Sequence, residues 1–116
     1  MFIGFSVSNY LSFKTAQTMS MAASKVARHK EHILNGNGKK ILKTGLIYGA
    51  NASGKSNLVK AIDFSRDIIL DGLGAVDLNK KYFRISGKCY KTPGVFEYRL
   101  ITHTGKEYSY GIAISY

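Results

Sequence analysis

Residues 49–56 have the types and spacing that phosphate chemistry requires. They read GANASGKS and satisfy the pattern G-x-x-x-x-G-K-S/T. Glycine at positions 49 and 54 allows backbone torsions and close approaches that a side chain would obstruct, so successive N–H groups can turn inward on phosphate oxygens. We therefore expect a phosphate-binding P-loop made by Gly49, Ala50, Asn51, Ala52, Ser53, Gly54, Lys55, Ser56 and Asn57.

Two side chains of this motif are expected to do its chemistry. Lys55 is predicted to contact the terminal phosphates of a nucleotide as a point charge, and it is the expected catalytic residue. The Ser56 hydroxyl is predicted to occupy one place in a Mg²⁺ shell, so the expected cofactors are ATP and Mg²⁺. A chance match on an ordinary strand, turn and helix is the alternative, and the agreement of all four fixed positions with both flanks argues against it.

The flanks of the motif predict a strand before it and a helix after it. From Ile41 an apolar run ends in Leu46-Ile47-Tyr48, which is typical of a parallel core strand buried on both faces. Residues 55–70 place apolar side chains on one side and charged ones on the other, which predicts an amphipathic helix of about four turns. The amides at the start of that helix add partial positive charge to the site.

The remaining elements are predicted to be antiparallel strands. Ile3, Phe5 and Val7 alternate with small residues, so 2–8 reads as a half-buried strand, followed by a turn and a second strand around 17–22. Residues 24–40 are polar and basic and are predicted to be a loop, with a turn signal at 35–38. Residues 95–116 predict a hairpin about Thr104-Gly105, with Leu100 opposite Tyr110 on one face.

The chain as a whole is expected to be one lobe, residues 1–116. At 116 residues it is small for a complete nucleotide-hydrolysing fold, and its last strand keeps its alternation to Tyr116. We expect either that the lobe belongs to a longer protein or that another chain completes its sheet.

Three other features resemble functional motifs, and a structural explanation is favoured for each. Residues 68–71 imitate the apolar run and aspartate of a Walker B strand, but they continue the helix after the motif. His29, Glu31 and His32 could suggest a metal site, although no second ligand pair lies in the loop and a solvated polar stretch explains them. Residues 85–88 resemble a nucleotide-signature loop faintly, and a turn after a short strand is a sufficient explanation.

The charge of the chain favours polyanionic partners. The formal net charge is +10, and the basic excess lies on both sides of the motif, in 1–45 and in 80–116. Such a balance attracts nucleic acid first and acidic membrane surfaces second, and the alternatives are a solvated basic face or a surface that meets an acidic region elsewhere. The single cysteine cannot form an internal disulfide, and no leader or membrane span is evident, so we expect a cytoplasmic protein without membrane contact.

Residues 49–58 resemble the Walker A motif of ABC-type ATPase heads of the SMC-like kind. The strand at 2–8 with the following residues 9–14, NYLSFK, is similar to the N-terminal strand and turn of the same heads. Together they resemble the AAA ATP-binding proteins related to the bacterial OLD and abortive-infection ATPases, over residues 1–70 and, as a hairpin, over 95–116. Two departures concern Ala50 and Ala52, which replace proline and glycine, and Leu11, which replaces a basic residue near the nucleotide and leaves that contact to another residue such as Lys14.

The resemblance implies a fold, an activity and partners. The fold class would be α/β, a P-loop NTPase N-terminal lobe with antiparallel strands packed beside a strand, P-loop and helix. The complete protein would hydrolyse ATP between two heads, as a homodimer, and couple closure to a nucleic-acid-related or phage-defence process. The signature, Walker B and switch residues are not evident, and the sole glutamine, Gln17, precedes the motif, so this chain is expected to bind nucleotide without efficient hydrolysis.

Two other readings compete with an ATPase head. The first is a basic nucleic-acid-binding module whose P-loop grips backbone phosphate, which steep salt dependence and indifference to nucleotide would support. The second is a fragment of a P-loop kinase, since Walker A alone does not identify the phosphoryl acceptor. The predicted antiparallel strands disfavour it, because kinases usually continue in parallel strand and helix units.

Overall fold

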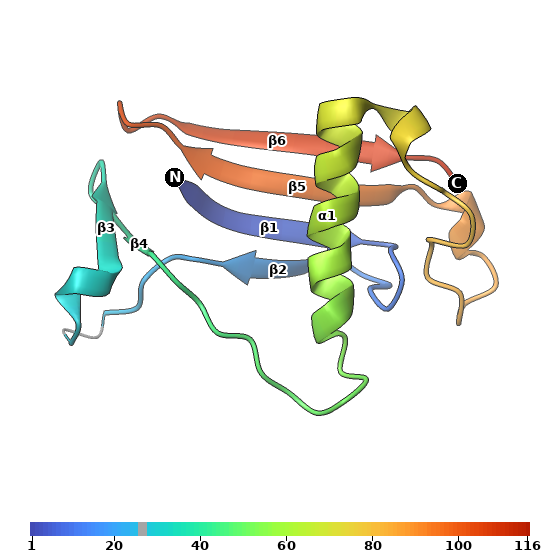
Figure 1. Ribbon diagram of the computed structural model, residues 1–116, viewed down its shortest axis with the longest axis horizontal. Coiled ribbons are helices and arrows are strands. Elements are labelled where there is room, and N and C mark those ends of the chain that lie inside the picture. The colour runs from blue at the N-terminus through green and yellow to red at the C-terminus, as the bar shows by residue number, and fades with distance from the viewer. Residues whose placement is uncertain (26–27) are drawn as a thin grey trace.

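The structure is a computed structural model that describes residues 1–25 and 28–116. A four-stranded antiparallel sheet of order β2-β1-β5-β6 forms one layer, the helix α1 crosses one face of it, and a small sheet of β3 and β4 stands at one end (Figure 1). The mixed α/β class predicted from the sequence is confirmed. The strands are β1 Phe2–Ser8, β2 Gln17–Ser20, β3 Ile33–Gly36, β4 Lys39–Leu42, β5 Gly94–Ile101 and β6 Glu107–Ile114, and the helices are α1 Lys55–Asp71 and the 3₁₀ turns η1 Lys30–His32, η2 Leu73–Ala75 and η3 Cys89–Lys91.

The core lies between β1, β5 and α1. Phe5 and Phe96 are almost fully buried and pack with Phe64 of the helix. Burying aromatic side chains of this size stabilises the fold by about 1.5–3 kcal/mol each. The strand predicted at 2–8 is confirmed as β1, which pairs with β2 on one side and with β5 on the other.

One residue of β1 does not lie where the alternation placed it. The pairing of β1 with β5 shifts between Phe2 and Gly4, so Ile3 is the extra residue of a bulge. Ile3 therefore does not pack with Phe5 and Val7, and it lies instead in a second cluster with Ile41 and Ile101. The prediction that Ile3 shares a side with Phe5 and Val7 was wrong, because a bulge reverses the side to which the residues before it point.

The hairpin of β5 and β6 confirms the prediction of a turn about Thr104-Gly105. Its register differs from the prediction by two residues, since Leu100 pairs with Tyr108 and Tyr98 pairs with Tyr110. The connection 102–106 has an odd number of residues, as expected, and is closed by a backbone hydrogen bond from Thr102 to Lys106. The even positions of both strands therefore still share one face.

Residues 33–42 form a second hairpin, although 24–40 was predicted as a loop; residues 26–27 of that prediction lie outside the described residues. β3 and β4 pair with Gly36 opposite Lys39, and Asn37 and Gly38 between them have φ of 45° and 80°. Positive φ at both central residues is the signature of a type I′ turn, for which Asn-Gly is the preferred sequence. The turn signal was correct, but each strand has only four residues, too few for the alternation to be recognised.

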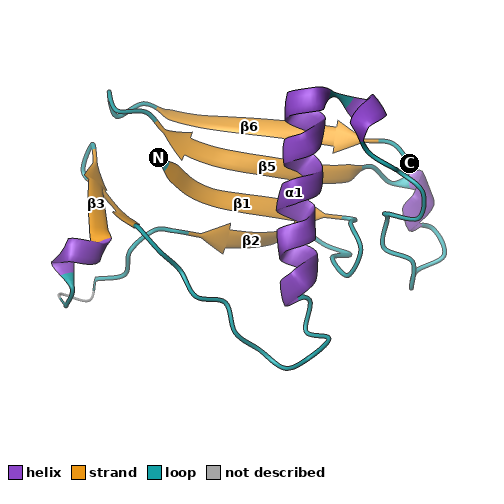
Figure 2. Cartoon of the chain, in the orientation of Figure 1, coloured by secondary structure: helices purple, strands orange, loops and turns teal. Residues whose placement is uncertain are grey.

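The parallel core strand predicted from Ile41 to Tyr48 is not present. β4 is antiparallel and ends at Leu42, and the chain then runs outside both sheets until α1 begins (Figure 2). Leu46 is 90% exposed and Tyr48 is 92% exposed. A strand buried on both faces needs neighbouring strands, and among the described residues none lies beside 44–48.

The helix predicted at 55–70 is confirmed as α1. Its buried residues Ala61, Phe64 and Ser65 face the sheet, while charged side chains and some apolar ones, such as Leu70, are exposed. The helix ends where Gly72 adopts a φ of 84°, a conformation that glycine tolerates best. Residues 68–71 belong to its last turn, so the interpretation of this run as a helix end is also confirmed.

Candidate functional site at residues 49–57

The loop before α1 has a backbone that requires small residues. Gly54, at the start of the helix, is left-handed with φ 95°, and Ala52 has φ 65°. A left-handed conformation costs an L-residue about 1–2 kcal/mol, so the loop holds Ala52 under strain. A Cβ atom at Gly49 would lie 2.9 Å from the Ser53 hydroxyl, so the Ser53 side chain would have to move to make room for it.

The Lys55 ammonium group folds back over this loop. Its Nζ atom donates hydrogen bonds to the carbonyl oxygens of Gly49 and Ala50, both at 2.6 Å, and to Ser53 Oγ at 3.3 Å. An ammonium group has three donors, so the loop satisfies all of them. An anion that entered the loop could compete for these donors as a stronger, charge-assisted acceptor.

The beginning of α1 offers further donors to an anion. No side chain caps this end of the helix, which leaves the first N–H groups without intrahelical partners. These amides and the helix dipole favour negative charge at this point. No acidic residue lies in the first turn, and Lys55 adds a full positive charge. The exposed Ser56 hydroxyl is available to a ligand beside them.

The turn after β1 is attached to the start of the helix. Asn57 donates a hydrogen bond from Nδ2 to Ser12 Oγ at 2.9 Å, and a Cβ atom at Gly54 would lie 3.2 Å from the same oxygen. Asn9 and Leu11 of this turn have positive φ. Sequence reasoning assigned no role to Ser12, although the residues 9–14 that carry the family resemblance contain it.

Lys55 lines two hollows. One, of about 310 Å³, is lined by residues 51–57, so seven of the nine predicted binding residues surround it. The other, of about 320 Å³, lies toward β2 and includes Phe13, Met19 and Tyr48 together with Gly49 and Lys55. Ala50 lines neither, although its carbonyl accepts the Lys55 bond. The first hollow is polar and suits phosphate, whereas the second offers apolar and aromatic surface.

Comparison with known families supports the assignment of this loop. The family model described as "AAA domain, putative AbiEii toxin, Type IV TA system" matches residues 46–116, which is 71 of the 116 residues and includes the whole motif. The chain belongs to this AAA domain family. No curated protein and no solved structure matches the chain. Membership supports a P-loop ATPase family and nucleotide binding, as the motif predicted.

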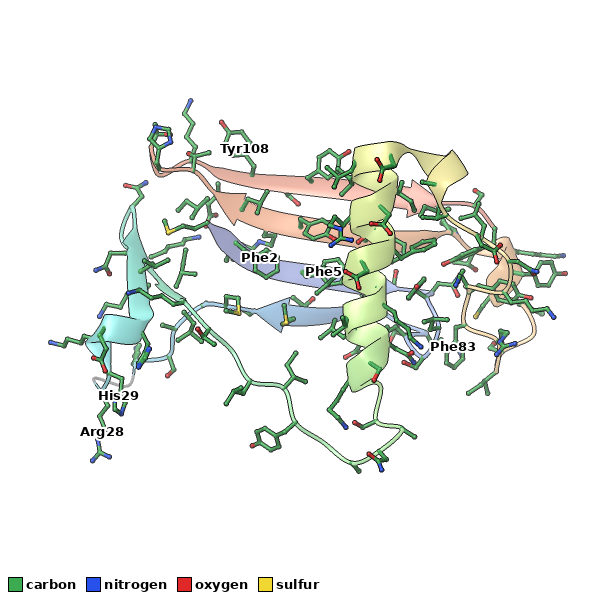
Figure 3. The ribbon with its side chains drawn as sticks, viewed as in Figure 1. Phe2, Phe5, Arg28, His29, Phe83 and Tyr108 are labelled. Atoms are coloured by element: carbon green, nitrogen blue, oxygen red, sulfur yellow. The ribbon has the colours of Figure 1, made fainter. Side chains whose placement is uncertain are left out.

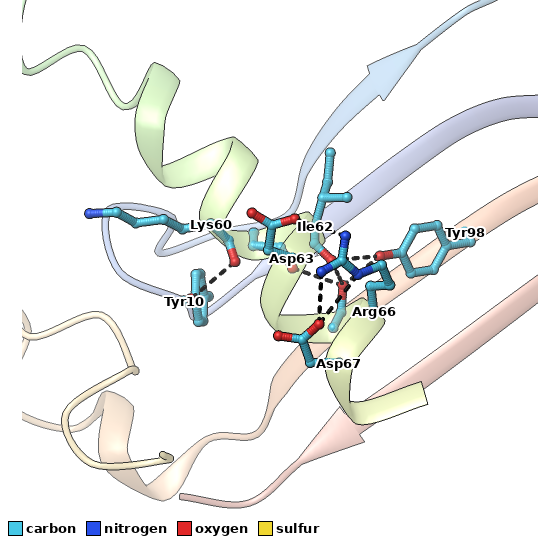
Figure 4. A network of polar contacts seen from close by, with 9 residues as sticks. Tyr10, Lys60, Ile62, Asp63, Arg66, Asp67 and Tyr98 are labelled. Atoms are coloured by element: carbon cyan, nitrogen blue, oxygen red, sulfur yellow. Dashed lines mark hydrogen bonds and ion pairs between the residues drawn. The ribbon is translucent and has the colours of Figure 1, made fainter. Parts of the chain in front are cut away.

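Two tyrosines hold α1 against the sheet (Figure 4). Tyr10 donates a hydrogen bond to the Lys60 carbonyl at 3.3 Å, and Tyr98 donates to the Ile62 carbonyl at 3.2 Å while contacting Ser65 Oγ at 2.6 Å. Burial raises the pKa of Tyr10 to about 12, and the charge of Asp63 adds to the shift. Burial also raises the pKa of Tyr98. These contacts fix the helix whose first residues form the candidate site.

The His29, Glu31 and His32 cluster lies at η1, directly before β3, and Figure 3 shows His29 at the end of the molecule that carries the β3–β4 hairpin. The structure brings the three ligand atoms within 4.8 Å of one another, with His29 Nδ1 at 3.1 Å and His32 Nε2 at 3.6 Å from the Glu31 carboxylate. A hydrogen bond from its own backbone lowers the pKa of Glu31, and the contact with His29 adds to this. All three side chains are exposed, so a solvated polar stretch remains the interpretation.

Residues 85–88 of the AAA domain form a turn that leads into η3, and among the described residues no strand precedes it. The predicted turn is confirmed, whereas the prediction of a short strand before it was wrong. No helix in the described part of the chain is long and apolar enough to cross a membrane.

Proposed function

We propose that residues 49–57 form a P-loop that binds Mg·ATP, and that the chain is the N-terminal lobe of an ABC-type, SMC-like ATPase head. One observation carries the proposal. Lys55 lies over a loop that begins and ends with glycine, at the start of a helix that no side chain caps, in a chain of the AAA domain family. The loop backbone and Lys55 hold the phosphates in this proposal, and Lys55 exchanges its carbonyl partners for phosphate oxygens.

The same residues fit a magnesium ion bound with the nucleotide. Ser56 is exposed in the first turn of α1, next to Lys55, and a hydroxyl oxygen is a ligand that Mg²⁺ accepts. Magnesium supplies charge neutralisation between phosphates when it is bound. The aromatic hollow beside Phe13 and Tyr48 is the proposed place for the base, because it joins the polar hollow at Lys55.

Hydrolysis is proposed for the complete protein rather than for this chain. Among the described residues, neither hollow at the loop is lined by an acidic side chain that could position or activate water. By resemblance, a C-terminal lobe and a second head supply the missing groups in a cytoplasmic homodimer that acts in a nucleic-acid-related or phage-defence process.

The test is calorimetric titration of Mg·ATP into the wild-type chain, Lys55→Ala and the matched control Lys60→Ala, which also removes an exposed lysine of α1. We expect binding by the wild type and by Lys60→Ala, dependence on Mg²⁺, and loss of binding in folded Lys55→Ala. Unchanged affinity in Lys55→Ala would remove the basis of the proposal.

The alternative is a basic nucleic-acid-binding module in which the loop grips backbone phosphate, a possibility that the net charge of +10 favours. It predicts that an oligonucleotide and Mg·ATP compete for one site at Lys55. Oligonucleotide binding that is lost in Lys55→Ala, with no detectable ATP binding by the wild type, would favour this alternative.

A further inference from the structure

The segment between η2 and β5 combines positive charge with aromatic rings. Residues 80–91 read KKYFRISGKCYK, and they contain five basic side chains, three aromatic side chains and no acid. The segment lies at the end of the molecule that also holds the C-terminus, opposite the β3–β4 hairpin (Figure 1). Positive charge interleaved with aromatic rings is the composition by which proteins bind single-stranded nucleic acid.

The charges of this segment are free to meet an external anion. Among the described residues, none of the five basic side chains of 80–91 forms an ion pair, whereas Lys39 and Arg66 elsewhere do. Lys80, Arg84, Lys88 and Lys91 are exposed. Their mutual repulsion is not offset within the segment, so a polyanion would find unneutralised charge there.

Tyr90 presents a supported aromatic ring. It is 49% exposed, its ring centroid lies 6.4 Å from that of Tyr82, and Tyr82 in turn contacts Tyr116 at 5.6 Å. Lys91 Nζ lies 5.6 Å from the Tyr90 centroid. Lys91 therefore lies over the Tyr90 ring, and Tyr82 packs beside it at a tilt. A base that stacked on this ring would take the place of the lysine, whose ammonium group could then contact the phosphate of the same nucleotide.

The segment is held in shape by one buried side chain. Asn9, only 3% exposed, donates from Nδ2 to the carbonyls of Cys89 and Thr92, both at 2.7 Å, and its Oδ1 accepts the Phe83 N–H at 3.1 Å. The Leu11 N–H donates to the Lys81 carbonyl at 2.7 Å. A surface organised before binding loses less entropy when it meets a ligand.

We propose that residues 80–91 are a docking surface for single-stranded nucleic acid, in which the basic side chains contact phosphates and Tyr90 stacks on a base. A single strand is favoured over a duplex because the bases of a duplex stack on one another and leave no face for Tyr90 to stack on. A duplex would offer this surface only its phosphates, and Tyr90 would then contribute nothing to binding. This surface is separate from the nucleotide loop, and the proposal does not depend on ATP binding.

The experiment measures fluorescence anisotropy of a short labelled oligothymidine on the full chain, over salt from about 50 to 200 mM. Tyr90→Ala should weaken binding about 5- to 150-fold, the range for one stacked base, and Tyr90→Phe should retain it. Arg84→Ala and Lys88→Ala should each lower the slope of log affinity against log salt concentration by about one. The matched controls Tyr108→Ala and Lys40→Ala change an exposed ring and an exposed cation outside the segment, and they should have little effect.

Four outcomes would overturn the proposal. Equal losses in Lys40→Ala and Lys88→Ala would show diffuse attraction to charge, and full binding by folded Tyr90→Ala would show that no base stacks there. Equal affinity for a duplex, polyglutamate or anionic phospholipid vesicles would show that the partner is a different polyanion. Displacement of the oligonucleotide by saturating Mg·ATP would place it at residues 49–57 instead.

Discussion

Ser12 and Asn57 are 45 positions apart in the sequence, and their side chains meet at 2.9 Å beside the start of α1. This contact joins the turn after the central strand β1 to the residue that follows Ser56. Residues 49–53 of the loop are exposed and lie outside both sheets, so the turn after β1 supports the end of the loop from outside it. We infer that this support positions the first turn of the helix for its ligand.

Removing this hydrogen bond should weaken nucleotide binding. Ser12→Ala is expected to lower Mg·ATP affinity about 2- to 10-fold, the value of one modest hydrogen bond. Titration calorimetry on Ser12→Ala, Asn57→Ala and the double variant would measure it, with the exposed Ser115→Ala as control. Because the two side chains act as a pair, Ser12→Ala should cause little further loss of Mg·ATP affinity when Asn57 is already alanine. If the losses of the two single variants instead add up in the double variant, the two side chains do not act as a pair.

Replacing Gly54 by alanine should destabilise the fold more than the same change at a glycine whose φ and surroundings accept a Cβ atom. Gly54→Ala places a Cβ atom on a residue with φ 95° and within 3.2 Å of Ser12 Oγ, so the free energy of unfolding should fall by about 1–2 kcal/mol. Gly74 is a matched control, because a Cβ atom there meets nothing within 4 Å. Urea denaturation of the two alanine variants would compare them, and equal stability would show that the loop relaxes freely.

The isolated chain should turn over ATP at a negligible rate even at saturating nucleotide. No acidic side chain among the described residues lines the hollows at Lys55, so water has no group there to position or activate it. A phosphate-release assay would measure the rate, with Lys55→Ala as the background. Robust hydrolysis that disappears in Lys55→Ala would show that the groups needed for water activation are already present.

Stability should fall at alkaline pH through Tyr10. Burial raises its pKa to about 12 from 10, so the folded state holds the phenolic proton more tightly than the unfolded state does. This contribution is complete below pH 10 and is lost as the pH rises toward 12. Tyr10→Phe cannot ionise, so its free energy of unfolding should depend less on pH between 10 and 12 in urea titrations. Identical pH profiles for the two proteins would contradict the assignment.

The elements that could be predicted from the sequence are those with a long, regular pattern. The strand around Phe5, the helix from Lys55 and the β5–β6 hairpin each show a clear period over seven residues or more, so periodicity identified them. The short hairpin at Asn37-Gly38 was missed because four-residue strands carry too little pattern. The residues of the candidate site were predicted because loop chemistry requires glycine, lysine and serine at fixed spacing.

The errors share a different cause, which is that sequence patterns do not report neighbours. Ile3 alternates correctly with Phe5, yet a bulge opposite β5 turns it to another cluster. Leu46 and Tyr48 have the composition of a buried strand, but burial depends on partners that the described residues do not provide. Ser12 escaped notice for the same reason, since its partner lies far along the chain.

The strand β6 is an edge strand of eight residues, with β5 as its only neighbour in the described part of the chain. It contains no lysine, proline or bulge that would discourage pairing with another strand. Beside it, a hollow of about 530 Å³ is lined mainly by apolar and aromatic side chains of α1, β5 and β6, including Leu70, Tyr108 and Tyr110. We therefore expect the chain to self-associate through β6 independently of ATP, and sedimentation velocity with and without Mg·ATP would measure this.

Tyr110→Lys should abolish the association by placing a charge in the hollow, while Thr104→Lys, on the exposed turn, should leave it intact. Ile112 is less suitable for the test because it packs against the core. A wild-type chain that stays monomeric at high concentration would show that β6 is not adhesive, and association that requires ATP and persists in Tyr110→Lys would locate the contact at the nucleotide loop.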